Sequence, residues 1–178
     1  MNSILSTSLA LAVIASTALV LHAAEATTPK VGDKAPPFEA KDQEGKVWKL
    51  ADTLSKQAVL LYFYPKDETP GCTKEACGLR DRMDAMKKDD VQVLGVSFDT
   101  AESHQKFITK HNLNFPLLVD TDGKIADAYG ARIAGRNMAR RVSFLIGKDG
   151  KIQQVTDTPS ADTHLSEMQD AIAKLKKP

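Results

Sequence analysis

The chain has 178 residues, of which 42% are hydrophobic and 26% are charged, a balance typical of a globular protein rather than a disordered one. Its 24 Lys and Arg residues stand against 23 Asp and Glu residues, so the formal net charge is +1. This charge gives no electrostatic case for a nucleic-acid partner or for an anionic membrane surface. The length allows one domain of ordinary size.

The N-terminus differs from the rest of the chain. Residues 9–21 carry no charge and are mostly Ala, Leu, Val and Ile, but the run is short for a membrane span. Ala24-Glu25-Ala26 follows, a small-x-small pattern that signal peptidases cut after. We therefore expect a signal peptide over 1–26, export to a bacterial periplasm, and a mature domain over 27–178 with no stable membrane association. Residues 1–8 lack Lys and Arg, so an uncleaved anchor or a misplaced start stays an alternative.

Apolar periodicity predicts alternating strands and helices in the mature domain. The expected strands are 38–41 and 47–50 as a hairpin, then 58–64, 91–98, 115–119, and 141–146 with 151–155 as a second hairpin about Asp149-Gly150. The expected helices are 70–88, 101–111, a short one near 125–129, and 161–176. This order predicts an α/β domain whose central mixed sheet carries helices on both faces, preceded by an N-terminal β-hairpin.

The segment from Tyr64 to Cys77 carries the chemistry. A buried strand ends, a loop bounded by prolines follows, and Cys72 arrives in the first turn of a helix. Helix N-termini expose unpaired N–H groups and partial positive charge, which favour the ionised thiolate. Since the thiolate is the nucleophilic form of cysteine, this position predicts a reactive sulfur.

The second cysteine, Cys77, lies five residues further on. Five residues of ideal helix span about 7.5 Å along the axis and about 140° around it, so the Cα atoms lie more than roughly 8 Å apart. A disulfide needs less than roughly 7 Å. A Cys72–Cys77 disulfide therefore requires the first helical turns to unwind.

The motif Pro-x3-Thr-x2-Cys, matched here by Pro65, Thr69 and Cys72, resembles that of the peroxiredoxins. The run Thr-Pro-Gly-Cys-Thr-x2-Ala-Cys-Gly-Leu-Arg-Asp over 69–81 is similar to the bacterioferritin comigratory protein (peroxiredoxin Q) subfamily. The resemblance extends from about Val31 to the C-terminus, and it implies a thioredoxin-like fold.

The resemblance also implies a role for each matching residue. Cys72 would attack the peroxide and become a sulfenic acid, Thr69 would hydrogen-bond the peroxide and the thiolate, and Pro65 would shield the sulfur from water. Cys77 would resolve the sulfenic acid as a disulfide.

A distant arginine completes the implied site, just before a Ser/Thr-Phe strand. The matching run is Arg-Val-Ser-Phe, which assigns Arg141. Arg140 is adjacent, and strand alternation would point it the other way.

The implied function is a thiol-dependent peroxidase of the atypical 2-Cys type in antioxidant defence. Its substrates would be hydrogen peroxide and organic hydroperoxides, and a thioredoxin-like dithiol would be its reductant. Export would separate the chain from cytosolic thioredoxin, so we expect an exported dithiol fed from the membrane. We expect a monomer, and the sequence implies no cofactor and no metal.

Two other functions stay open. An exported thiol–disulfide oxidoreductase acting on protein disulfides is one, although such proteins usually carry Cys-x2-Cys. A copper carrier using two thiolates and a histidine is the other, although such carriers tend to have Cys-x3-Cys. His104 and His111 share one helix face and could hold a metal, but we expect both to be exposed histidines without a ligand. Cys77 could also be a core residue and Arg141 a surface strand residue.

Overall fold

The structure is a computed structural model that describes residues 27–175. Its centre is a five-stranded sheet in the order β5-β4-β3-β6-β7. The strands are β3 (Ala58–Phe63), β4 (Val91–Ser97), β5 (Leu117–Val119), β6 (Val142–Ile146) and β7 (Ile152–Asp157). Strands β3, β4 and β5 are parallel, whereas β6 pairs antiparallel with both β3 and β7. The sheet is therefore mixed, as the sequence predicts.

Helices α2 (Pro70–Arg80), α3 (Met83–Lys88) and α6 (Ala161–Leu175) cover one face of the sheet. Side chains alternate across a strand, so Leu60 and Tyr62 of β3 point into this layer. Helix α4 (Ala101–His111) joins the same cluster through Phe107. This face places the start of α2 against the carboxyl end of β3.

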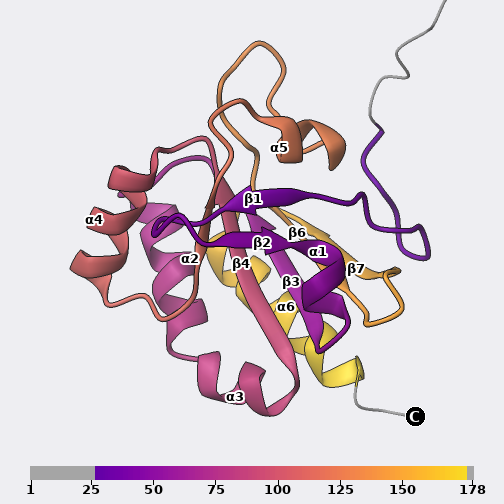
Figure 1. The fold of residues 1–178 in the computed structure, drawn as a ribbon. Coiled ribbons are helices and arrows are strands. Elements are labelled where there is room, and N and C mark those ends of the chain that lie inside the picture. Colours follow the sequence, from indigo (N-terminus) through magenta and orange to yellow (C-terminus); the bar gives the residue numbers. More distant parts are fainter. Residues whose placement is uncertain (1–26, 176–178) are drawn as a thin grey trace, which may run out of the picture.

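The opposite face is covered by α1 (Leu50–Leu54), α5 (Lys124–Ala128) and a separate hairpin of β1 (Glu39–Lys41) and β2 (Val47–Lys49). Figure 1 shows the hairpin crossing in front of the sheet, with α6 behind it. Leu61 and Phe63 of β3 pack on this side. Since β3 is buried on both faces, the apolar run that identified it contains no polar position.

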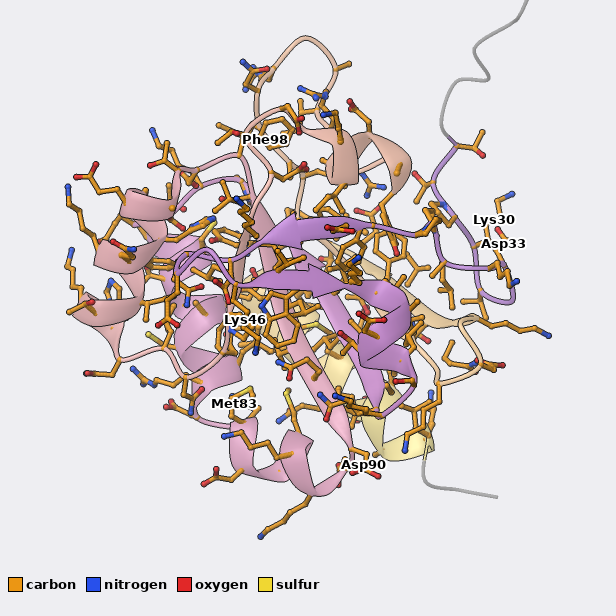
Figure 2. All side chains as sticks on the ribbon, viewed as in Figure 1. Lys30, Asp33, Lys46, Met83, Asp90 and Phe98 are labelled. Carbon is orange, nitrogen blue, oxygen red and sulfur yellow. The ribbon has the colours of Figure 1, made fainter. Side chains whose placement is uncertain are left out.

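One predicted element is wrong in its extent. The single helix expected over 70–88 is divided, because α2 ends at Arg80 and α3 begins at Met83, a residue labelled in Figure 2. Between them the Arg82 amide bonds the Leu79 carbonyl three residues back, and its guanidinium donates to the Gly78 carbonyl at 2.7 Å. A side chain thus takes a carbonyl that a continuing helix would have used. The apolar stripe runs across the break, which hides it from periodicity.

The expected signal peptide over 1–26 lies outside the described residues. Within residues 27–175, no helix combines the length and apolarity needed to cross a bilayer.

Candidate active site

Cys72 lies at the third position of α2, directly after the loop that leaves β3. Thr69 is the extended residue at the N-cap, and its carbonyl accepts the first helical bond from the Thr73 amide at 2.8 Å. Pro70 occupies the first helical position, where a missing N–H costs nothing. Cys72 is only 2% exposed. The sulfur therefore lies at the positive end of a helix and almost out of bulk water.

Arg141, just before β6, reaches this sulfur from the strand that pairs with β3. Its Nη2 donates to Cys72 Sγ at 3.4 Å, and its Nη1 donates to the Glu75 carboxylate. Burial opposes the guanidinium's charge, but Glu75 and Cys72 outweigh it and raise the pKa of Arg141 above its usual value. The neighbouring Arg140 turns away to Asp157 and Thr28, as strand alternation predicts.

Glu75 is a buried carboxylate of the site that the sequence motif does not include. It lies one turn after Cys72, and its side chain is fully buried. Burial raises the pKa of Glu75 to about 7, although Arg141 opposes the shift. Among the described residues, Oε1 has no hydrogen-bond partner, whereas Oε2 faces Arg141. A proton on Glu75 therefore belongs on Oε1.

His164 of α6 lies against that same oxygen, with Nε2 3.6 Å from Glu75 Oε1. Burial lowers the pKa of His164 to about 4, so the ring is neutral near pH 7. Nδ1 faces the Thr158 carbonyl at 3.4 Å, which can only accept, so the single ring proton sits there. Nε2 then accepts from Ser143 Oγ at 2.7 Å. Glu75, which bonds the guanidinium beside Cys72, is thus backed by the buried pair of His164 and Ser143.

Thr69 and Pro65 lie in the loop between β3 and α2. The Thr69 hydroxyl donates to the Lys66 carbonyl at 3.0 Å, and its oxygen keeps lone pairs that can accept a further bond. Pro65 is half-buried at the beginning of the loop. The structure therefore brings Cys72 and Arg141 into contact, and it places Thr69 three residues before the sulfur on the same loop–helix junction.

Cys77 is half-buried on α2, and the two cysteines are unbridged thiols. Helix α2 is continuous from Pro70 to Arg80 and contains both of them. The separation of an ideal helix therefore applies to this pair, and a bond between them needs local unwinding.

A second buried carboxylate, Asp67, anchors the same loop to α4. Its Oδ2 lies 2.9 Å from His104 Nδ1, and both side chains are almost fully buried. The expectation that His104 and His111 are exposed is wrong, because His104 is fully buried and His111 is partly buried. His104 lies one turn before Phe107 on the inward face of α4, where its polar ring has a carboxylate partner.

The apolar periodicity of helices α2 and α6 points to two of the buried polar residues, Glu75 and His164. Glu75 falls on the same stripe as Ala76 and Leu79, and His164 falls on the stripe of Leu165 and Met168. A charged residue at an inward position requires a buried partner. A charged or polar residue on the apolar stripe of a helix is therefore a candidate site residue.

Within the same described part of the chain, no group of three or more His, Cys, Asp or Glu side chains is arranged to hold a metal ion.

Comparison with known proteins gives one family. The chain matches the AhpC/TSA family over residues 31–155. It is 45% identical to peroxiredoxin Bcp of Escherichia coli over 141 residues, which cover 76% of this chain and 90% of that protein. It is 40% identical to peroxiredoxin Bcp of Bacillus subtilis over 146 residues, 79% of this chain and 92% of that protein.

Among solved structures, peroxidoxin BcpB of Mycobacterium tuberculosis superposes with a TM-score of 0.78 at 33% identity. The match covers 84% of this chain and 99% of that one. The sheet with helices on both faces is thus the thioredoxin-like fold with an N-terminal hairpin, as expected. The chain belongs to the AhpC/TSA family, and within it the chain is a peroxiredoxin similar to the Bcp and peroxiredoxin Q proteins.

Proposed function

We propose that this peroxiredoxin reduces hydrogen peroxide and organic hydroperoxides with Cys72 as the attacking thiolate and Cys77 as the resolving thiol. The observation that carries the proposal is the Arg141 guanidinium 3.4 Å from the Cys72 sulfur at the beginning of α2. A cation and unpaired helix N–H groups at one sulfur stabilise the thiolate, and they also stabilise negative charge on an oxygen that leaves next to it.

In the first step the Cys72 thiolate attacks the terminal oxygen of the hydroperoxide. The S–O bond forms as the O–O bond breaks, the sulfur is oxidised to a sulfenic acid, and the departing alkoxide or hydroxide takes a proton to become alcohol or water. The Thr69 oxygen, with its hydrogen committed to Lys66, is oriented to accept from the peroxide O–H. Pro65 covers the loop side of the sulfur against water.

In the second step the Cys77 thiolate attacks the sulfenic sulfur, the S–S bond forms, and hydroxide leaves and is protonated to water. Because α2 holds both cysteines, this step follows unwinding of the first turns. An external thioredoxin-like dithiol then donates two electrons by exchange and becomes a disulfide itself. We propose that the enzyme works as a monomer.

We further propose that residues 1–26 are a signal peptide and that the domain of 27–178 acts in the periplasm with an exported, membrane-fed dithiol. The match to the family begins at residue 31, which supports a leader before it. The mass of the N-terminal peptide of protein recovered from a periplasmic fraction tests this point. Full-length protein in the cytoplasm would contradict it.

Mass spectrometry after one equivalent of peroxide tests the chemistry. The wild-type protein should lose two hydrogen atoms, the Cys77→Ser variant should gain one oxygen at Cys72, and Cys72→Ser should stay unchanged. Peroxide that persists in the presence of fully reduced wild-type protein would refute the proposal. An assay of disulfide reduction in a denatured client, without peroxide, separates this function from protein disulfide exchange.

A further inference from the structure

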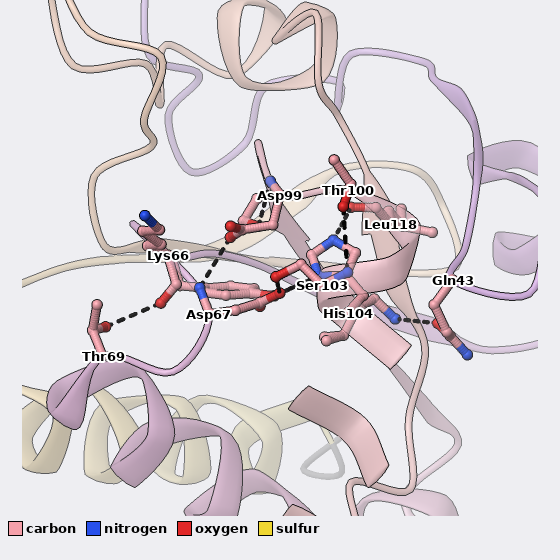
Figure 3. Close-up of polar contacts among 12 residues, drawn as sticks. Gln43, Lys66, Asp67, Thr69, Asp99, Thr100, Ser103, His104 and Leu118 are labelled. Carbon is pink, nitrogen blue, oxygen red and sulfur yellow. Dashed lines mark hydrogen bonds and ion pairs between the residues drawn. The ribbon is translucent and has the colours of Figure 1, made fainter. Parts of the chain in front are cut away.

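The loop that carries Pro65 and Thr69 is held from one side by buried groups that the proposed chemistry does not use. Asp67 lies in the middle of this loop and is 4% exposed. Its Oδ1 accepts from Tyr64 Oη at 2.7 Å, and its Oδ2 accepts from Ser103 Oγ at 2.7 Å and faces His104 Nδ1 at 2.9 Å. Figure 3 shows this cluster between the loop and α4. A short polar turn is thereby attached to a helix that is far away in sequence.

The backbone of Asp67 is fixed as well as its side chain. Its amide donates to Asp99 Oδ2 at 2.9 Å, and the Ser97 hydroxyl donates to the same oxygen at 2.7 Å. Asp99 follows β4, so this contact ties the loop to the carboxyl end of the neighbouring strand. Asp67 therefore cannot shift without breaking contacts to two separate elements.

These contacts lead directly to the Thr69 hydroxyl. The Lys66 carbonyl belongs to the peptide unit whose amide is that of Asp67, and Thr69 Oγ1 donates to that carbonyl at 3.0 Å. A peptide unit is planar, so fixing the Asp67 amide fixes the Lys66 carbonyl. That carbonyl in turn fixes the direction of the Thr69 O–H bond and of the oxygen lone pairs.

The loop backbone needs such support. Glu68, between Asp67 and Thr69, has φ of +63°, a left-handed conformation that costs a residue with a side chain about 1 kcal/mol or more. The exposed Glu68–Lys110 ion pair also links the loop to α4, but an exposed pair contributes little. The buried Asp67 cluster is therefore the main restraint from α4.

We propose that Asp67 and His104 are positioning residues for peroxide reduction: their buried contact holds the loop so that the Thr69 hydroxyl faces the oxidant beside Cys72. This inference rests on the proposed function. Neither residue touches the sulfur or the oxidant, and both act through the Lys66 carbonyl and Thr69. The sulfur itself is held separately, by α2 and Arg141.

Two reactions of Cys72 distinguish positioning of the oxidant from general support of the fold. Peroxide reduction needs the oriented Thr69 hydroxyl, whereas alkylation by iodoacetamide needs only an accessible thiolate. We would measure both rate constants in a Cys77→Ser background, where Cys72 is the single thiol. Thermal unfolding of each variant verifies that it is folded at the assay temperature.

His104→Leu leaves the Asp67 carboxylate buried without its ring partner, and the loop should move toward water to solvate it. We expect the peroxide rate constant to fall about tenfold or more, while alkylation changes less than about threefold, because a small misplacement of an orienting group costs that much. His104→Gln, whose amide can donate to Asp67, should recover part of the loss. Lys110→Ala is the matched control, on the same helix and facing the same loop, and it should leave both rates near wild type.

If His104→Leu is folded and reduces peroxide at the wild-type rate, the pair does not position the loop. If both reactions fall together, the role is structural and the inference is also wrong. If His104→Leu does not fold, Tyr64→Phe takes its place, because it removes one donor to Asp67 and keeps the ring. In that variant the peroxide rate constant should again fall more than the alkylation rate constant, by a smaller factor. Failure of the proposed function is distinct, because the wild-type protein would then be alkylated without consuming peroxide.

Discussion

Two buried carboxylates, Asp67 in the loop before α2 and Glu75 within α2, each lie near a buried histidine. Their pKa values are nevertheless shifted in opposite directions. Burial acts to raise the pKa of both carboxyl groups. For Asp67 this effect is outweighed by the hydrogen bonds from His104, Ser103 and Tyr64, and its pKa lies below the usual value. Within residues 27–175, Arg141 is the one side chain that donates to Glu75, and burial raises the pKa of Glu75 to about 7. Glu75 is the more deeply buried of the two and accepts fewer hydrogen bonds, and both differences favour its higher pKa.

The two carboxylates therefore have different roles in the site. A carboxylate with three donors stays ionised and holds a loop in one position. A carboxylate with one oxygen unpartnered can take up a proton near neutral pH, and the charge beside the guanidinium at Cys72 then changes. The loop side is built to be rigid, and the Glu75 side is built to respond to pH.

The largest expected effect comes from Arg141→Met. The change removes the cation at Cys72 and should lower the peroxide rate constant about 100-fold or more. Breaking a buried ion pair costs about 3–5 kcal/mol when the remaining charge cannot escape, but Glu75 can protonate. The loss of unfolding free energy should therefore be greater at pH 8.5 than at pH 6. Stopped-flow kinetics and urea denaturation measure the two effects.

Arg140→Met is the matched control for this substitution, because the neighbouring guanidinium bonds Asp157 and Thr28 away from the sulfur. It should keep most of the peroxide activity. If Arg141→Met lost the same unfolding free energy at pH 6 and at pH 8.5, Glu75 would not be taking up a proton in this range.

The next largest effect is on the pH dependence of the unfolding free energy. Glu75 titrates at about 7 when folded and near 4.5 when unfolded, so its contribution to stability is lost as pH rises through that window. His164 titrates at about 4 when folded and near 6.5 when unfolded, so its contribution is lost as pH falls through its window. The two slopes have opposite signs and nearly cancel between pH 4.5 and 6.5 in the wild-type protein.

Single substitutions should separate these slopes. Relative to wild type, His164→Gln should lose stability as pH rises from 4 to 6.5, and Glu75→Gln should gain stability as pH rises from 4.5 to 7. Each difference can reach about 3 kcal/mol, from a shift of roughly two to three pH units. Chemical denaturation at a series of pH values gives the comparison. Parallel profiles for both variants would show that neither group is perturbed as described.

A smaller effect tests the other carboxylate. Ser103→Ala removes one of the three donors to Asp67, which should cost about 1.5 kcal/mol at pH 7. Because the lowered pKa of Asp67 stabilises the fold only while the group is ionised, the cost should fade below pH 4. Acid titration of unfolding free energy, with Ser55→Ala at an exposed backbone contact as the control, measures it. A cost that stays the same in acid, after Asp67 has taken up its proton, would mean that the hydroxyl acts by packing alone.

Much of the fold could be predicted from local patterns. The apolar run of β3, the amphipathic stripe of α6 and the Asp149-Gly150 turn each identified an element correctly, because burial imposes a period on the sequence. The division of α2 from α3 could not be predicted, since it depends on an arginine side chain taking a helical carbonyl. Such competition leaves no trace in the apolar pattern.

The sequence likewise predicts one part of the candidate site and not the other. The Cys72 position follows from a strand, a turn and a helix start that adjoin in sequence, and the Arg141 position follows from a motif. The partners of Glu75, Asp67 and the two buried histidines depend on which elements pack against each other. Partners such as Asp67 and His104 lie 37 residues apart, and the sequence alone gives no reason to pair them.

The smallest expected effect concerns Gly71, which lies directly before Cys72 and beside Arg141. A Cβ at Gly71 would lie 3.2 Å from Arg141 Nη2, close enough to move the end of that flexible side chain by a few tenths of an ångström. Gly71→Ala should therefore lower the peroxide rate constant only about two- to fivefold, while helix propensity leaves stability unchanged or raised by up to about 1 kcal/mol. Gly78→Ala on the same helix is the contrasting control, because its Cβ would lie 2.4 Å from Leu165 Cδ1 and should destabilise the contact with α6. If Gly71→Ala left the rate constant unchanged, the exact approach of the guanidinium would not limit the reaction, and the charge on that side of the site would matter more than its geometry.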